Sequence, residues 1–140
     1  MWSQDTRTRG VRCVVAEPKK TILVVDDERD FREGLADFLE TDGFRAVTAA
    51  DGEKALAYLT NGNAPDLIVL DLRMPNADGW SLYVWLMNSD LSHVPVVIVS
   101  GLSMESGLVE KMNRDGPVWL SKPVDPRELL AAVREHLSRV

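Results

Sequence analysis

LIVLDLRMP, residues 67–75, joins four aliphatic residues directly to an acid, Asp71. An uninterrupted apolar run of this kind predicts a strand that is buried on both faces, as in a parallel sheet. A carboxylate is costly in an apolar interior unless it is paired with a positive charge or bound to a metal. The strand is therefore expected to deliver Asp71 to an open edge of the sheet, where other polar groups meet it.

Strands and helices are predicted to alternate along the rest of the chain. The other strand-like runs are residues 21–25, 44–49, 94–100 and 118–121. Helical patterns follow each run, including a polar one around residues 103–114. Five strands alternating with five helices predict a doubly wound α/β domain, with a five-stranded parallel sheet and helices on both faces. The predicted domain covers residues 21–140, and residues 1–20 are predicted to form an N-terminal tail.

Composition argues against several kinds of partner. The formal net charge is −6, and residues 1–20 are basic (+3) whereas residues 21–140 are acidic (−9). An acidic body argues against nucleic acid, whose phosphates attract basic proteins. The lone Cys13 excludes an internal disulfide, which is typical of a reducing cytoplasm. No apolar run reaches the ~18 residues that span a membrane, and residues 1–20 lack the apolar stretch that is typical of a signal peptide. The sequence predicts a cytoplasmic protein without membrane or nucleic-acid partners.

Polar side chains stand at the carboxyl ends of four predicted strands. They are Asp26, Asp27, Asp71, Ser100, Ser121 and Lys122. In a parallel α/β sheet these ends share one edge, where functional sites form. Three neighbouring carboxylates repel one another, and a hard cation such as Mg²⁺ relieves the repulsion. A metal ion together with a lysine suits an incoming phosphoryl group, which a carboxylate attacks at phosphorus.

Four short motifs, VVDD, LDLRMP, VSG and LSKP, follow one another along the chain. Their residues Asp27, Asp71, Ser100 and Lys122 are 44, 29 and 22 residues apart. Motifs and spacings together resemble the receiver domain of bacterial two-component response regulators over about residues 21–138. The chain ends just after the last predicted helix, so the resemblance is to the single-domain, CheY-like type. It implies a flavodoxin-like sheet with the strand order 2-1-3-4-5.

The resemblance implies a metal-assisted phosphorylation site. Asp71 matches the phosphoacceptor of the family. Asp26 and Asp27 match the acidic pair that holds Mg²⁺ together with Asp71. Arg73 stands at the position whose backbone carbonyl binds the metal, so its side chain is free to vary.

Four further residues match positions that respond to the phosphoryl group. Lys122 matches the lysine that pairs with it, and Ser100 the switch hydroxyl that binds it. Pro123 matches a proline that is often preceded by a cis peptide bond. Trp119 matches the aromatic switch position, usually Tyr or Phe, and is either a switch or a simple packing residue.

The function implied by the resemblance is a phosphorylation-dependent signalling switch in a two-component system or phosphorelay. The phosphodonor would be a sensor histidine kinase or a histidine phosphotransfer protein. Output would reach a downstream protein through the fourth helix, last strand and last helix, and the chain would be a monomer or weak homodimer. It would not be a metabolic enzyme. It would catalyse at most its own phosphotransfer and slow autodephosphorylation.

Two other functions stay open at this point. One is a docking module with the receiver fold, in which the large Trp119 prevents conformational switching. The other is a hydrolase with an aspartate nucleophile. Phosphatases that resemble haloacid dehalogenases need a second acid two residues after the nucleophile, and here Arg73 fills that position.

GWSLYVWLM, residues 79–87, predicts a helix that is apolar on two faces. The residues expected to cover the sheet are Leu82, Trp85 and Leu86. The second stripe consists of Trp80, Val84 and Met87. A surface helix normally turns a polar face outward, so the stripe either contacts a partner or another copy of the chain, or folds against neighbouring loops.

Overall fold

The computed structural model describes residues 19–72, 79–100 and 118–138 of the chain. Strands and helices alternate along it as the apolar runs predict. They are β1 (Thr21–Val25), α1 (Arg29–Thr41), β2 (Arg45–Ala49), α2 (Gly52–Thr60), β3 (Leu67–Leu70), α3 (Gly79–Met87), β4 (Val96–Ser100), β5 (Val118–Ser121) and α5 (Pro126–Ser138). The predicted fourth helix around residues 103–114 and nearly all of the predicted tail lie outside the described residues.

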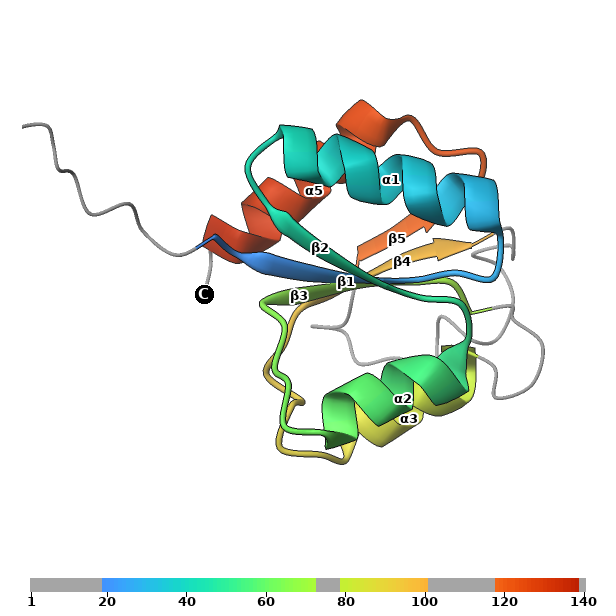
Figure 1. The fold of residues 1–140 in the computed structure, drawn as a ribbon, viewed down its shortest axis with the longest axis vertical. Helices are drawn as coiled ribbons and strands as arrows, with labels where there is room; N and C mark the ends of the chain where they lie inside the picture. The colour runs from blue at the N-terminus through green and yellow to red at the C-terminus, as the bar shows by residue number, and fades with distance from the viewer. Residues whose placement is uncertain (1–18, 73–78, 101–117, 139–140) are drawn as a thin grey trace, which may run out of the picture.

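The strands form one parallel sheet in the order β2-β1-β3-β4-β5, which confirms the predicted doubly wound arrangement. Helices α1 and α5 cover one face of the sheet, and α2 and α3 cover the other (Figure 1). The strand order reverses between β1 and β3, which are neighbours in the sheet although α1, β2 and α2 separate them in the sequence. The carboxyl ends of these two strands are therefore the expected place for a site.

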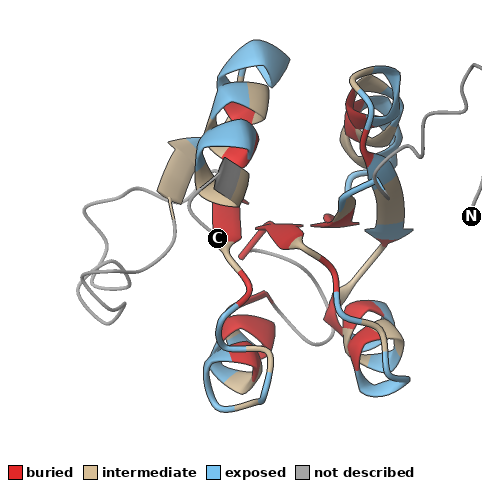
Figure 2. Cartoon of the chain, turned by 90° about the vertical axis from the view of Figure 1, so that its left-hand side faces the viewer, coloured by how far each residue is buried: buried red, intermediate tan, exposed pale blue. Residues whose placement is uncertain are grey.

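Each face of the sheet has its own apolar core. On the α2–α3 side the core includes Leu23, Val25, Ile68 and Leu70. On the α1–α5 side it includes the alternate strand residues, such as Val24, together with helix residues. Burial is concentrated on the strands and on the sides of the helices that face them (Figure 2). Because β1 and β3 are buried on both faces, only their ends can present polar groups to solvent.

Helix α3 departs in part from the predicted pattern of faces. Leu82 and Leu86 are buried as predicted, but the third buried large residue is Tyr83, and Trp85 is only half-buried. In the second stripe, Trp80 is half-buried and stacks on Tyr83, with 5.9 Å between the ring centroids. Val84 and Met87 are 42% and 36% exposed. A helix without a polar face gives no periodic signal that decides which apolar residues turn inward. None of the helices in the described segments combines the length and apolar character needed to cross a bilayer.

Candidate functional site

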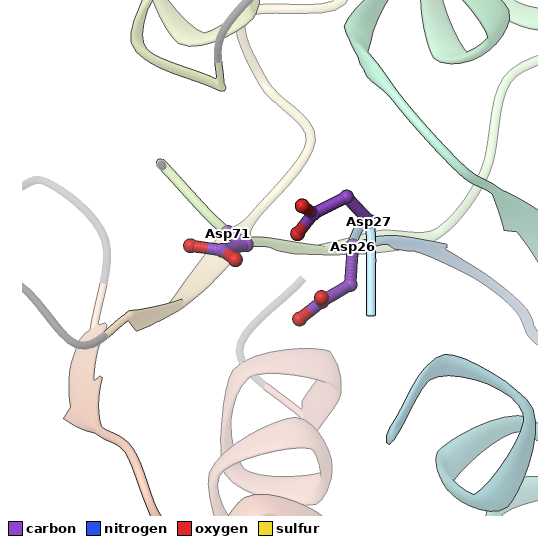
Figure 3. A group of neighbouring side chains, drawn as sticks. All are labelled: Asp26, Asp27 and Asp71. Atoms are coloured by element: carbon purple, nitrogen blue, oxygen red, sulfur yellow. The ribbon is translucent and has the colours of Figure 1, made fainter. Parts of the chain in front are cut away.

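The register of the sheet brings the predicted acids together. β1 and β3 pair with Val25 opposite Leu70, so the residues that follow, Asp26 and Asp71, leave the sheet side by side. The backbone N–H of Asp71 donates to the carbonyl of Val25 at 3.0 Å. Carboxylate oxygens of Asp26, Asp27 and Asp71 all lie within 4.8 Å of one another (Figure 3). The three acids form one cluster at the edge of the sheet.

Burial divides these acids into two kinds. Asp26 and Asp71 are 2% and 5% exposed, whereas Asp27 is open to solvent. A buried carboxylate must be hydrogen-bonded or paired. One Asp26 oxygen accepts a hydrogen bond from the backbone N–H of Glu28 at 2.8 Å, and Arg32 donates to the Asp26 carbonyl at 2.9 Å. The loop between β1 and α1 is thereby anchored, with Asp27 on its outer side.

Lys122 supplies positive charge to the cluster. Its Nζ donates to Asp26 Oδ2 at 2.8 Å and to Asp71 Oδ2 at 3.3 Å. Burial by itself lowers the pKa of Lys122, but the hydrogen bonds and charges of Asp26 and Asp71 outweigh burial and raise the pKa above its ordinary value. The ammonium is therefore protonated at neutral pH and connects the end of β5 to the ends of β1 and β3.

The charges of the cluster fit a divalent cation. At their formal charges, the three carboxylates and the one ammonium sum to −2. The ligand atoms are all oxygens, which Mg²⁺ and similar hard ions prefer. Asp27 is the most accessible of the three carboxylates, because it is exposed whereas Asp26 and Asp71 are buried. The residues present can hold Mg²⁺ together with an anionic phosphoryl group.

Gly79 is a site residue that the sequence analysis missed. It opens α3, and its backbone packs against that of Asp71. A Cβ at position 79 would lie 2.0 Å from the Asp71 carbonyl oxygen and 2.7 Å from the Cα of Leu72. Only glycine allows this approach. The only sequence signal is a glycine shortly after Asp71, and it does not reveal which backbone comes close.

The other predicted site residues are described to different extents. Ser100 ends β4 opposite Ser121, and the structure describes its backbone but not its side chain. Arg73, the predicted carbonyl ligand, lies outside the described residues. The peptide bond between Lys122 and Pro123 is cis, which is the geometry expected for Pro123. The structure therefore brings four of the predicted side chains together, Asp26, Asp27, Asp71 and Lys122.

Trp119 lies on β5 opposite Ile98 of β4. Its side chain is half-buried and packs against the core on the α2–α3 face of the sheet. The indole N–H is buried and has no hydrogen-bond partner in the described part of the chain. A buried donor without a partner costs free energy, so within the part of the chain that the structure describes, apolar packing holds the ring.

An apolar groove of about 300 Å³ adjoins the site. Phe31, Leu35 and Phe38 of α1 line one side of it. Val124, Pro126 and Leu129 line the other side. The groove is not predictable from local sequence patterns, because it depends on how α1 and α5 lie relative to each other.

Comparison with known families identifies the family to which this fold belongs. A family model described as the response regulator receiver domain matches residues 22–134. The receiver domain of the Francisella response regulator 1452 has a similar structure, with a TM-score of 0.78 at 30% identity over 86% of this chain and 98% of that one. Fold and family model agree over the same part of the chain.

Curated relatives are similar over the same region. The probable transcriptional regulator ycf27 of Porphyridium aerugineum is 37% identical over 122 residues, which are 87% of this chain and 50% of that protein. The phosphate regulon transcriptional regulatory protein PhoB of Pseudomonas aeruginosa is 32% identical over 121 residues, 86% of this chain and 52% of that protein. The chain spans about half the length of these relatives.

These relatives correct one prediction. The prediction that nucleic acid is not a partner is wrong, because the relatives are named as transcriptional regulators. It rested on the net charge of residues 21–140. The charge of one domain limits only what that domain attracts directly, and it does not extend to the half of the relatives that lies outside the match. The single-domain type stays a prediction for the same reason.

Proposed function

The chain belongs to the response regulator receiver domain family, and from this premise we propose that it is a signalling switch phosphorylated on Asp71. One observation carries the proposal. The Asp71 carboxylate lies within 4.8 Å of the Asp26 and Asp27 carboxylate oxygens, and the Lys122 ammonium donates to it at 3.3 Å. A nucleophilic carboxylate between a metal-binding acid pair and a fixed ammonium suits phosphoryl transfer.

The proposed reaction transfers the phosphoryl group from a phosphorylated histidine of a sensor kinase or phosphotransfer protein. An Asp71 oxygen attacks phosphorus and forms the O–P bond. The P–N bond to the donor histidine breaks, and the imidazole keeps its electron pair. Lys122 stabilises the charge on the phosphoryl oxygens through its ammonium. Mg²⁺, when bound by Asp26, Asp27, Asp71 and the backbone carbonyl of Arg73, supplies further positive charge to the same oxygens.

The relatives support an output that reaches gene expression. Both are named as transcriptional regulators, so we propose that phosphorylation of this chain also contributes to the control of transcription. The signal would pass from Asp71 through the Ser100 hydroxyl to the surface around β5 and α5. Phosphorylation would shift the population between two states of this surface. Autodephosphorylation would then reset the switch.

The proposal is tested by phosphorylation with a small donor. We expect incubation with phosphoramidate and Mg²⁺ to add one phosphoryl group, measured by intact mass. Asp71→Asn should abolish the addition, because the amide is a poor nucleophile. Asp90→Asn is the matched control, since Asp90 is an exposed acid away from the cluster, and it should be phosphorylated like the wild type. Wild-type protein that takes up no phosphoryl group from this donor or from a histidine kinase would overturn the proposal.

A second candidate function is a docking module that does not switch. The packing of Trp119 against the α2–α3 core favours this candidate, because movement of the ring would break apolar contacts that it already makes. Trp fluorescence separates the two candidates. A switch predicts a change in emission on phosphorylation that is absent from Trp119→Phe. A docking module predicts phosphorylation with unchanged emission from Trp119.

A further inference from the structure

The Lys122 ammonium lies over the ring of Phe31, with Nζ 4.7 Å from the ring centroid. A cation within about 6 Å of an aromatic centroid is attracted by the negative face of the ring. We propose that Phe31 is a positioning residue, which holds the Lys122 ammonium at Asp26 and Asp71 and so prepares it to receive the phosphoryl group. This inference rests on the proposed phosphorylation of Asp71.

Lys122 needs to be positioned because three carboxylates compete for it. Besides Asp26 and Asp71, Oε1 of Glu28 lies 3.6 Å from Nζ. The Glu28 side chain is 62% exposed, whereas those of Asp26 and Asp71 are 2% and 6% exposed. A lysine side chain is a flexible stem of four carbons that does not fix its own charge. A closer ion pair with Glu28 would draw the ammonium towards solvent and away from a phosphoryl group on Asp71.

Phe31 is well placed to oppose this pull. It lies near the start of α1, three residues after Glu28, and is packed against the core of the α1–α5 face. This packing restricts the ring, and a side chain held by packing helps to keep a neighbouring reactive group in position. The ring attracts the ammonium through the negative face of its π system. Unlike a carboxylate, it neither takes up the proton of Lys122 nor forms an ion pair with it. Phe31 thus adds an attraction that is independent of the acids.

Phe31 also lines the groove between α1 and the residues around the start of α5. One residue therefore contacts both the lysine of the site and the surface beside it. Other groove residues on α1 lack this position. Phe38 lines the same groove but lies seven residues, about two helical turns, further along α1. Phe38 is consequently a matched control, with the same side chain on the same helix and in the same groove.

The test compares rates of Asp71 phosphorylation by phosphoramidate, which is too small to need the groove for docking. Phe31→Leu keeps the apolar volume but removes the aromatic face, and we expect the rate to fall by about three- to thirtyfold. Phe31→Tyr keeps the face and should restore a rate close to that of the wild type. Phe38→Leu should leave the rate unchanged. Equal rates in Phe31→Leu and Phe38→Leu would overturn the proposal.

A second readout does not depend on phosphorylation. Protons above an aromatic ring resonate upfield, so the ε-methylene protons of Lys122 should be shifted upfield in the NMR spectrum of the wild type. The shift should persist in Phe31→Tyr and Phe38→Leu and disappear in Phe31→Leu. Lys122 protons at ordinary positions in the wild type would overturn the role of Phe31. Wild-type protein that shows the shift but takes no phosphoryl group would instead refute the proposed function.

Discussion

Gly79 links the shape of the backbone to the position of Asp71. The Cβ of an alanine there would lie 2.0 Å from the Asp71 carbonyl oxygen, so the two segments must move apart. We expect Gly79→Ala to lower the free energy of unfolding by about 1–3 kcal/mol, measured by urea denaturation, and to slow phosphorylation of Asp71 as well. The clash is with backbone, which cannot turn away as a side chain does.

Gly34→Ala provides the matched control for this substitution. Gly34 lies within α1, and a Cβ there would meet nothing within 4 Å. Alanine is the better helix former, so this variant should gain up to about 1 kcal/mol. If both glycine variants changed stability by the same amount, the close approach at Asp71 would not be the cause.

Tyr83 makes a prediction about alkaline pH. Burial raises its pKa above the ordinary 10.0. Above pH 10 the unfolded chain loses the phenol proton while the folded chain keeps it, so stability falls as pH rises from there through the folded pKa. Tyr83→Phe should weaken this fall in urea denaturations between pH 9 and 11. Tyr58→Phe, which removes the only other tyrosine, should retain it.

The residues of the site were predictable to different degrees, for physical reasons. Asp26, Asp71 and Lys122 follow strand-like runs that are largely apolar, and parallel topology carries such ends to one edge. The contact of Phe31 with Lys122 joins residues 91 positions apart in the sequence, and it depends on how α1 packs on the sheet. No local pattern contains that information. The same holds for Gly79, whose neighbour is identified only by the folded backbone.

At the scale of the elements, β1 and β3 followed directly from their sequence because both are short apolar runs without a competing pattern. The faces of helix α3 could not be predicted in the same way, because the helix is apolar on more than one face and helical periodicity alone cannot assign them. Packing assigned Tyr83 to the interior and left Val84 and Met87 exposed. A short apolar run was thus enough to predict a strand that is buried on both faces, whereas a helix needs a contrast of polar and apolar residues before its faces can be assigned.

This assignment of the faces of α3 predicts two opposite effects in one helix. Val84→Lys should change the free energy of unfolding by no more than about 0.5 kcal/mol, because Val84 is 42% exposed. Leu86→Ala should lower it by about 2–5 kcal/mol, because Leu86 is fully buried and leaves a cavity. Urea denaturation of the two variants measures both values. A large loss of stability in Val84→Lys would mean that Val84, in the second stripe, is packed against other residues and is not exposed.

At the scale of the whole molecule, metal binding by the cluster of acids would be coupled to folding. A ligand that binds only the folded state stabilises it by about 2.7 kcal/mol at one hundred times its dissociation constant. Mg²⁺ should therefore raise the melting temperature of the wild type. Asp27→Asn should remove most of this increase while changing the metal-free stability little, because Asp27 is exposed. Asp37→Asn, an exposed acid in the middle of α1, should respond to Mg²⁺ like the wild type. An undiminished response in Asp27→Asn would contradict the metal site.

The pairing of Val25 with Leu70 has a consequence for the reliability of the signal. A strand that slips by one residue turns every side chain to the opposite face, and it would also separate the acids that meet at the end of β1 and β3. On the proposed function, a molecule with a misaligned sheet has no assembled site and would not be phosphorylated. Misfolded copies would then send no signal, because phosphoryl transfer requires the correctly paired sheet.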